Sequence, residues 1–167
     1  MRDVTTSFAR AAEDHLEDVL AYLVYLTRDR GVAEELTGDA FERALRLWSR
    51  YDPRKGSVKT WLCQVARTTA LDHFRAEKRR LRRETSYALA ERRDSAEPLA
   101  EGLSPELERA LAKLTPAERE VIALRVLLEL DGPSTARVLG ISPTACSTRL
   151  SRALHRLEEE MRDAVAA

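Results

Sequence analysis

Few aromatic residues, few cysteines and short apolar runs characterise this chain of 167 residues. Aromatic residues make up 5% of the sequence and hydrophobic residues 44%, a composition that favours packed helices over a sheet sandwich. No apolar run reaches the length of about eighteen residues that a membrane-spanning helix needs. The first residues, Met1-Arg2-Asp3, lack a signal-peptide pattern. We therefore expect a soluble, cytoplasmic and mainly helical protein.

The two cysteines, Cys63 and Cys146, lie far apart, and neither belongs to a CxxC pair. This spacing argues against a disulfide framework and against a zinc site, so buried, reduced thiols are expected. The histidines His15, His73 and His155 fall on separate expected helices. Because the sequence also contains no nucleophile motif and no phosphate-binding loop, we expect no metal, no cofactor and no enzymatic activity.

The formal net charge is zero, but the charges are unevenly distributed. Residues 1–41 carry 4 basic and 9 acidic side chains (net −5), residues 42–83 carry 13 and 4 (+9), and residues 84–167 carry 11 and 15 (−4). The stretch RAEKRRLRR, residues 75–83, holds six positive charges and one acidic residue. Such a block is typical of a surface that binds nucleic acid, because released counterions supply affinity. The alternative is a solvated helix face with scattered arginines.

Apolar spacing predicts three helices in the first half of the chain. The first spans about residues 7–27, with Ser7 as its cap and Leu16 among its apolar positions. The second spans about residues 32–49 and is followed by the polar turn YDPRKGS. Ser57, at the end of that turn, can cap a third helix that runs into the basic stretch. We expect these three helices to bury one core.

The second half begins with a stretch that lacks this periodicity. Residues 84–103 contain Ser, Pro, Gly and mainly acidic charge, which predicts a flexible acidic linker. Strong helix-start signals then predict four helices. The starts fall at Ser104-Pro105, at Thr115 with Glu118 three residues later, at Asp131 and at Ser142-Pro143.

The last two of these helices are predicted to form a helix-turn-helix. Gly140 ends the third helix of this half, and the tight turn before Ser142 is typical of that motif. The final helix has an apolar stripe that we expect to pack on the preceding helices. The stripe consists of Leu150, Ala153, Leu154, Leu157 and Met161.

Two segments resemble conserved regions of a known protein family. Residues 33–80, which include AEELTGDAFERALRLWSRYDPRKGSVKTWL, resemble region 2 of bacterial RNA polymerase sigma factors. Residues 107–161, with LTPAEREV and the helix-turn-helix, resemble region 4. Region 4 features alone are shared by many regulators, but region 2 at this spacing makes the combination specific. The short linker and the absence of a further domain are similar to the extracytoplasmic-function (ECF) group of the sigma-70 family.

The resemblance implies an all-α fold with two small helical domains. Residues 1–83 would form a three-helix region 2, residues 84–103 a flexible linker, and residues 104–167 a four-helix region 4. A protein of this family binds core RNA polymerase through the beta-prime and beta subunits. It directs promoter-specific initiation by recognising the minus-thirty-five and minus-ten elements, and it helps to open the duplex. An anti-sigma factor is a further candidate partner.

The resemblance also assigns these functions to residues. Polymerase binding is expected at Glu35, Leu36, Asp39, Phe41 and Leu47. Contacts to the minus-ten element are expected at Arg54, Lys55, Lys59, Trp61, Arg67, Thr68, Arg75, Lys78, Arg79 and Arg80. Contacts to the minus-thirty-five element are expected at Ser142, Thr144, Ser147, Thr148, Arg149 and Arg152.

Some of these positions have a plainer interpretation or depart from the family pattern. Phe41 and Trp61 could be core residues. Thr68 stands where the family often has Asn, and Ser147 where a basic residue is common. The helix with Ser147 is therefore expected to bind DNA weakly by itself, with Arg149 and Arg152 as its basic residues.

Two other functions and one signal at the chain's end remain open at this point. A stand-alone helix-turn-helix regulator would explain the second half of the chain but not the basic first half. A polymerase adaptor without DNA contact would make Arg79 and Arg80 dispensable. The terminal Ala166-Ala167 is similar to ends recognised by bacterial energy-dependent proteases, although an ordinary frayed helix end explains it too.

Overall fold

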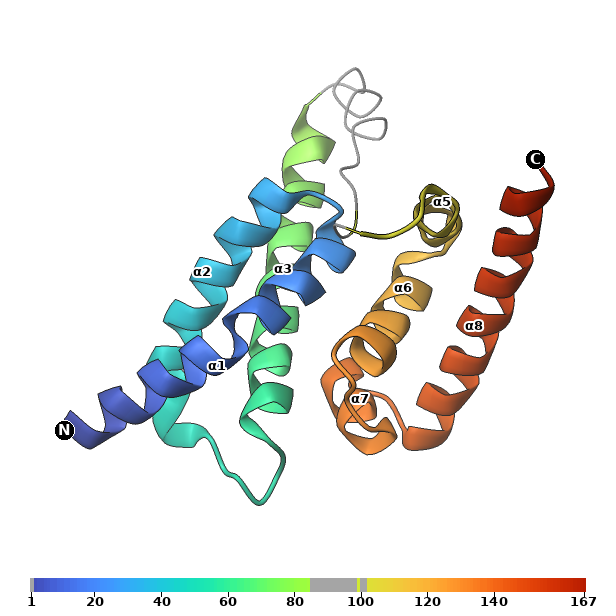
Figure 1. Ribbon diagram of the computed structural model, residues 1–167. Helices are drawn as coiled ribbons and strands as arrows, with labels where there is room; N and C mark the ends of the chain where they lie inside the picture. Colours follow the sequence, from blue (N-terminus) through green and yellow to red (C-terminus); the bar gives the residue numbers. More distant parts are fainter. Residues whose placement is uncertain (1, 85–98, 100–101) are drawn as a thin grey trace.

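The computed structural model describes residues 2–84, 99 and 102–167, and these form helices, turns and loops without any strand. The expectation of a flexible linker therefore lies mostly outside the described residues. The helices follow one another along the chain from the blue to the red end of Figure 1. They are α1 (Arg2–Thr27), α2 (Arg30–Leu47), the 3-10 helix η1 (Trp48–Arg50), α3 (Val58–Arg83), α5 (Pro105–Lys113), α6 (Pro116–Ile122), the π-helix η2 (Ala123–Leu127), α7 (Gly132–Leu139) and α8 (Pro143–Ala166).

Helices α1, α2 and α3 pack on one another and form the amino-terminal group. Tyr22, Leu23 and Cys63 are fully buried at its centre. Burial raises the pKa of the Cys63 thiol to about 12, so this cysteine remains an unreactive thiol. Ser57 caps α3 by accepting a hydrogen bond from the Thr60 amide, which confirms the predicted start of that helix.

The remaining helices form the carboxyl-terminal group, in which α8 packs on α5, α6 and α7. Every predicted helix start in this group is confirmed. Ser104, Asp131 and Ser142 each accept a hydrogen bond from the backbone three residues ahead, and Thr115 forms a capping box with Glu118. Gly140 ends α7 in the left-handed conformation, φ 65°, which a residue without Cβ adopts at no steric cost.

Removal of the Thr115 cap should destabilise the protein measurably. The Thr115 hydroxyl accepts from the Glu118 amide at 3.3 Å, and the Glu118 carboxylate accepts from the Thr115 amide at 2.8 Å. Thr115→Ala should lower the free energy of unfolding by about 1 kcal/mol, measured by chemical denaturation. Ser151→Ala, on the exposed face of α8, is the control and should change stability little. An equal loss in both variants would contradict the assigned role of the cap.

Three details of the sequence-based fold are corrected. Helix α1 starts at Arg2 instead of residue 7, because no Pro or Gly interrupts the preceding residues. Leu16 and Leu154 belong to predicted apolar stripes, yet their exposed fractions are 48% and 41%. The neighbouring helices therefore leave about half of each side chain uncovered. A helical period defines a face but not how far a partner extends across it.

The two groups also pack against each other. Helix α3 contacts α7, and α1 contacts α6 and η2, so the buried apolar residues of both groups form one cluster. Figure 1 shows the two groups side by side, with α8 on the side away from α2. Within the part of the chain that the structure describes, no helix is long and apolar enough to span a membrane.

Candidate nucleic-acid interface

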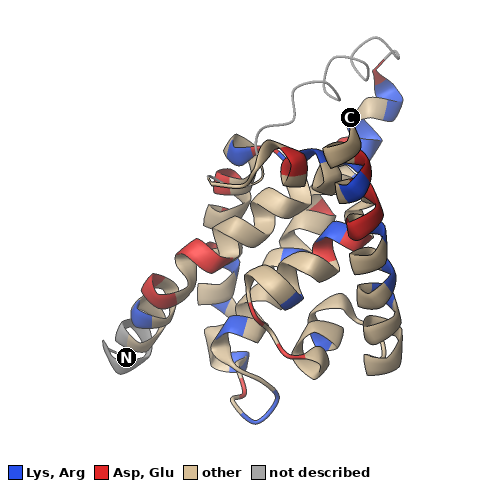
Figure 2. Ribbon diagram, turned by 45° about the vertical axis from the view of Figure 1, so that its right-hand side comes forward, with Lys and Arg blue, Asp and Glu red and all other residues tan. Residues whose placement is uncertain are grey.

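Basic side chains gather at both ends of α3. Figure 2 shows blue segments at the carboxyl-terminal end of α3, next to the grey trace, and in the loop before the helix. Arg75, Lys78, Arg79 and Arg80 are all exposed on this helix. Arg80 pairs with Glu77 at 3.1 Å, but surface pairs of this kind are weak and leave the guanidinium free to move to a phosphate. This part of α3 can therefore follow a nucleic-acid backbone.

The loop before α3 has a defined shape. The Asp52 carboxylate accepts hydrogen bonds from the guanidinium and then from the amide of Arg54, and these bonds lower the pKa of Asp52. The Tyr51 hydroxyl donates to the Gly56 carbonyl at 3.1 Å and closes the turn. Arg54 and Lys55 are exposed at its tip, whereas Lys59 is partly covered and pairs with Asp18 at 3.3 Å. Arg54 and Lys55 are therefore accessible to a phosphate.

An aromatic cluster supports this loop. Trp48 stacks on Tyr51 with ring centroids 5.3 Å apart, and Trp61 lies 5.7 Å from Trp48 and 5.6 Å from Tyr51. Trp61 is half-buried, so it contributes to the core and also keeps an open edge. A hollow of about 440 Å³ beside it is lined by Arg50, Tyr51, Asp52, Lys55, Gly56, Thr60, Trp61, Gln64 and Arg137. Aromatic edges beside cations suit an unstacked base.

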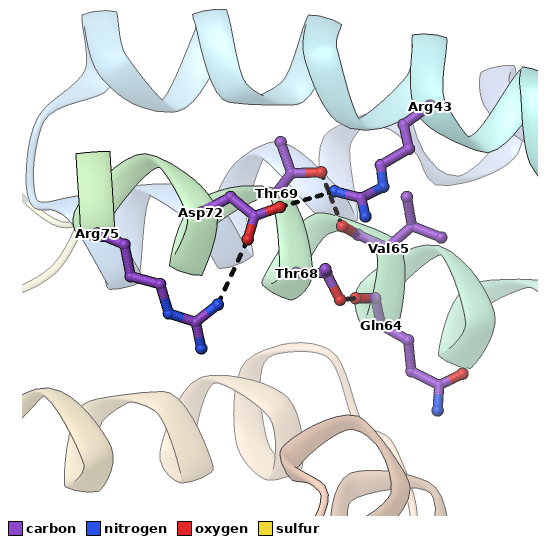
Figure 3. A network of polar contacts seen from close by, with 7 residues as sticks. All are labelled: Arg43, Gln64, Val65, Thr68, Thr69, Asp72 and Arg75. Carbon is purple, nitrogen blue, oxygen red and sulfur yellow. Dashed lines mark hydrogen bonds and ion pairs between the residues drawn. The ribbon is translucent and has the colours of Figure 1, made fainter. Parts of the chain in front are cut away.

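The middle of α3 carries several polar contacts, which are shown in Figure 3. Arg43, on α2, donates to Asp72 at 3.0 Å, and Asp72 also pairs with Arg75 at 3.4 Å. The hydroxyls of Thr68 and Thr69 donate to carbonyls one turn earlier, those of Gln64 and Val65. Thr68 remains exposed, with its hydroxyl oxygen able to accept a further bond.

Among contacts between described residues, Arg67 is the predicted DNA contact whose guanidinium forms an ion pair with the other group of helices. Its Nε donates to Glu120 of α6 at 2.7 Å, and the Tyr22 hydroxyl donates to the same carboxylate oxygen at 2.6 Å. Burial, followed by the nearby Glu120 charge, raises the pKa of Tyr22 well above its usual value, so the phenol keeps its proton. Burial opposes the charged form of Arg67, but the bond to Glu120 outweighs it and raises the pKa of Arg67.

The start of α8 presents the polar face that the cap position predicts. Thr144, Ser147, Thr148 and Arg152 are exposed, and Arg149 is half-buried. On the opposite face Cys146 is 2% exposed and Ala153 is fully buried. The Ser142 hydroxyl accepts a hydrogen bond from the Ala145 amide at 3.1 Å, so this oxygen caps α8. The start of α8 therefore exposes a small polar face on which Arg149 and Arg152 are the cations.

The candidate polymerase surface on α2 combines exposed acidic side chains with partly buried apolar ones. Glu35 and Asp39 are exposed, and Phe41 and Leu47 are half-buried. The expectation that Leu36 offers apolar contact is corrected, because its side chain is 2% exposed and packs in the core. Helical spacing also puts Leu45 on the apolar face of this helix, but its side chain is 48% exposed, so Leu45 is the leucine that could supply that contact.

Comparisons with known proteins agree with this geometry. Residues 11–80 match the sequence family "Sigma-70 region 2", and residues 104–157 match "Sigma-70, region 4". The chain is 33% identical over 139 residues to the probable RNA polymerase sigma-C factor of Mycobacterium bovis, covering 82% of this chain and 74% of that protein. It is 30% identical over 161 residues to the ECF RNA polymerase sigma factor BldN of Streptomyces coelicolor. That match covers 94% of this chain but 61% of the longer BldN.

Solved structures share the fold. The sigma factor RpoE from Bartonella quintana, crystallised with the anti-sigma factor NepR, superposes with a TM-score of 0.80 at 20% identity, over 93% of this chain and 97% of that one. CnrH, in complex with the cytosolic domain of CnrY, gives 0.69 at 20% identity, over 95% and 90%. The ECF RNA polymerase sigma factor SigC of Mycobacterium tuberculosis is likewise 33% identical over 139 residues, which cover 82% of this chain and 74% of that protein. With both sigma-70 regions matched in order along the chain, these relatives place it in the ECF group of the sigma-70 family of bacterial RNA polymerase sigma factors.

Proposed function

We propose that the chain binds core RNA polymerase through α2 and directs initiation at promoters with two elements. Glu35, Asp39 and Phe41 would contact the beta-prime subunit, with Leu45 and Leu47 as apolar neighbours. The observation that carries this proposal is the pairing of a basic α3 with an exposed reading face on α8 in one sigma-family chain. An anti-sigma factor, the partner in the RpoE crystal structure, is a candidate regulator here too.

The basic α3 and its loop would hold the opened minus-ten element. The hollow beside Trp61 is walled by aromatic rings and by Lys55, which suits one unstacked base of the non-template strand. Arg75, Lys78, Arg79 and Arg80 would then neutralise backbone phosphates further along. Such phosphate contacts position the DNA but carry little sequence information. The α8 face from Thr144 to Arg152 would contact the upstream element in the major groove.

Loss of two exposed arginines should weaken promoter binding without affecting polymerase binding. Combined Arg79→Ala and Arg80→Ala should lower holoenzyme affinity for promoter DNA several-fold and reduce the slope of log affinity against log salt by about two. Fluorescence anisotropy over a salt series measures both quantities. Arg162→Ala, which removes an exposed arginine of α8 that pairs with Glu158, is the matched control. If core-polymerase binding falls equally, the two arginines support the fold or the docking surface instead.

A further inference from the structure

Glu120 is a buried carboxylate at the junction of the two groups of helices. Its side chain is 8% exposed, and its partner Arg67 is 23% exposed. Among the ion pairs between described residues, this one has the least exposed side chains. Glu120 lies on α6, whereas both hydrogen-bond donors, Tyr22 and Arg67, lie on the amino-terminal group. This contact therefore exists only while the two groups are packed together.

The energetics of a buried ion pair allow another anion to replace the Glu120 carboxylate on Arg67. Burial of a carboxylate costs free energy that the ion pair and the tyrosine bond offset, so the net stabilisation of a buried pair is small. If the groups separate, Glu120 and Arg67 both regain water. A phosphate oxygen can then take the place of the carboxylate oxygen on Arg67, because a guanidinium donates hydrogen bonds to either anion in a similar geometry.

The same packing covers more of the proposed minus-ten surface than Arg67. Gln64, one turn before Arg67 on α3, donates to the Arg137 carbonyl of α7 at 3.4 Å. Arg137 also forms part of the wall of the hollow that contains Trp61. By contrast, Arg75, Arg79 and Arg80 are exposed beyond the covered part of the helix. The carboxyl-terminal group thus covers the centre of the surface and leaves its basic end free.

We propose that Glu120 occupies, on Arg67, the place of a DNA phosphate, so that the free chain hides this part of its own DNA-binding surface from single-stranded DNA. The inference rests on the proposed function, because it takes Arg67 to be a DNA contact. The apparent affinity for single-stranded DNA is then the affinity of the open form multiplied by the fraction of molecules in which the groups are separated. Any change that weakens the contact of Glu120 raises that fraction.

The test uses the full chain without polymerase and a short fluorescent single-stranded oligonucleotide of mixed sequence. Glu120→Gln removes the charge, and Tyr22→Phe removes one donor without altering charge or ring size. Both should bind the oligonucleotide about tenfold more tightly than the wild-type chain, as expected if about one molecule in ten is open. Small-angle X-ray scattering should show a larger radius of gyration for both. Glu159→Gln, an identical charge change on the exposed face of α8, is the control and should alter neither quantity.

Several results would overturn the proposal. Equal oligonucleotide affinity for Tyr22→Phe, Glu159→Gln and the wild type would show that Glu120 does not compete with DNA. If only Glu120→Gln bound the oligonucleotide more tightly, and its radius of gyration did not grow, the tighter binding would come from the lost negative charge and not from separation of the two groups. Expansion without tighter binding would show that packing hides no DNA contact. The proposed function is checked separately with the same proteins and core polymerase, because failure to initiate there would not alter the scattering result.

Discussion

Core polymerase should raise the affinity of this chain for duplex promoter DNA by about a hundredfold or more, because it lets two weak contacts act together. The chain has a formal net charge of zero, and the exposed face at the start of α8 carries few cations. In the proposed function, α3 would reach bases of the minus-ten element only after the duplex opens. The measurement is a titration of pooled promoter fragments with the chain alone, core alone and the reconstituted holoenzyme at matched salt.

Tight duplex binding by the free chain at physiological salt would contradict this expectation. It would favour the stand-alone helix-turn-helix regulator, which needs no polymerase. Equal binding by core alone and holoenzyme would instead favour an adaptor that does not contact DNA. The three reactions thus separate the functions that the sequence left open.

The second large effect concerns two adjacent residues of α8 that face opposite ways. Ser147 is exposed. Ser147→Arg would add a guanidinium that can donate two hydrogen bonds to a guanine, and such a pair is worth about 1 to 3 kcal/mol of base discrimination. We expect holoenzyme with this variant to bind more tightly and to select a guanine in the upstream element. The measurement is selection of upstream elements from a randomised library.

The matched variant is Cys146→Arg. Cys146 is 2% exposed, so an arginine there would leave an unpaired charge inside the carboxyl-terminal group and destabilise it by about 3 kcal/mol or more. Thermal unfolding should show this loss, whereas Ser147→Arg should unfold like the wild type. If Cys146→Arg stays folded and changes the selected sequence while Ser147→Arg does not, the reading face of α8 is wrongly assigned.

The sequence predicted these opposite faces because the signals are local. A Ser-Pro cap fixes where α8 begins, and the helical period then determines which side each residue faces. The same reasoning correctly located the starts of α3, α5, α6 and α7. Exposure of Leu16 and Leu154 was missed, because it depends on how far a neighbouring helix extends across each stripe.

The contact at Glu120 was beyond sequence analysis for the same reason. Glu120 lies 53 residues from Arg67 and 98 residues from Tyr22, and no spacing rule joins such positions. Charge counts located the basic α3 correctly, but they treated Arg67 like the exposed arginines that follow it. Helical spacing put Leu36 and Leu45 on the same apolar face of α2, yet Leu36 is 2% exposed and Leu45 48%, because the packing of neighbouring helices decides which part of that face is covered.

Multi-round transcription with purified bacterial core polymerase on a genomic promoter library tests the central claim most directly. Each reaction contains core with the wild-type chain, core with the Arg79→Ala and Arg80→Ala variant, or core alone. The account predicts initiation by the wild-type holoenzyme at a restricted set of sites that share an upstream and a minus-ten element, with weaker initiation by the variant as salt rises. Initiation no greater than that of core alone would contradict the claim that this chain directs promoter recognition.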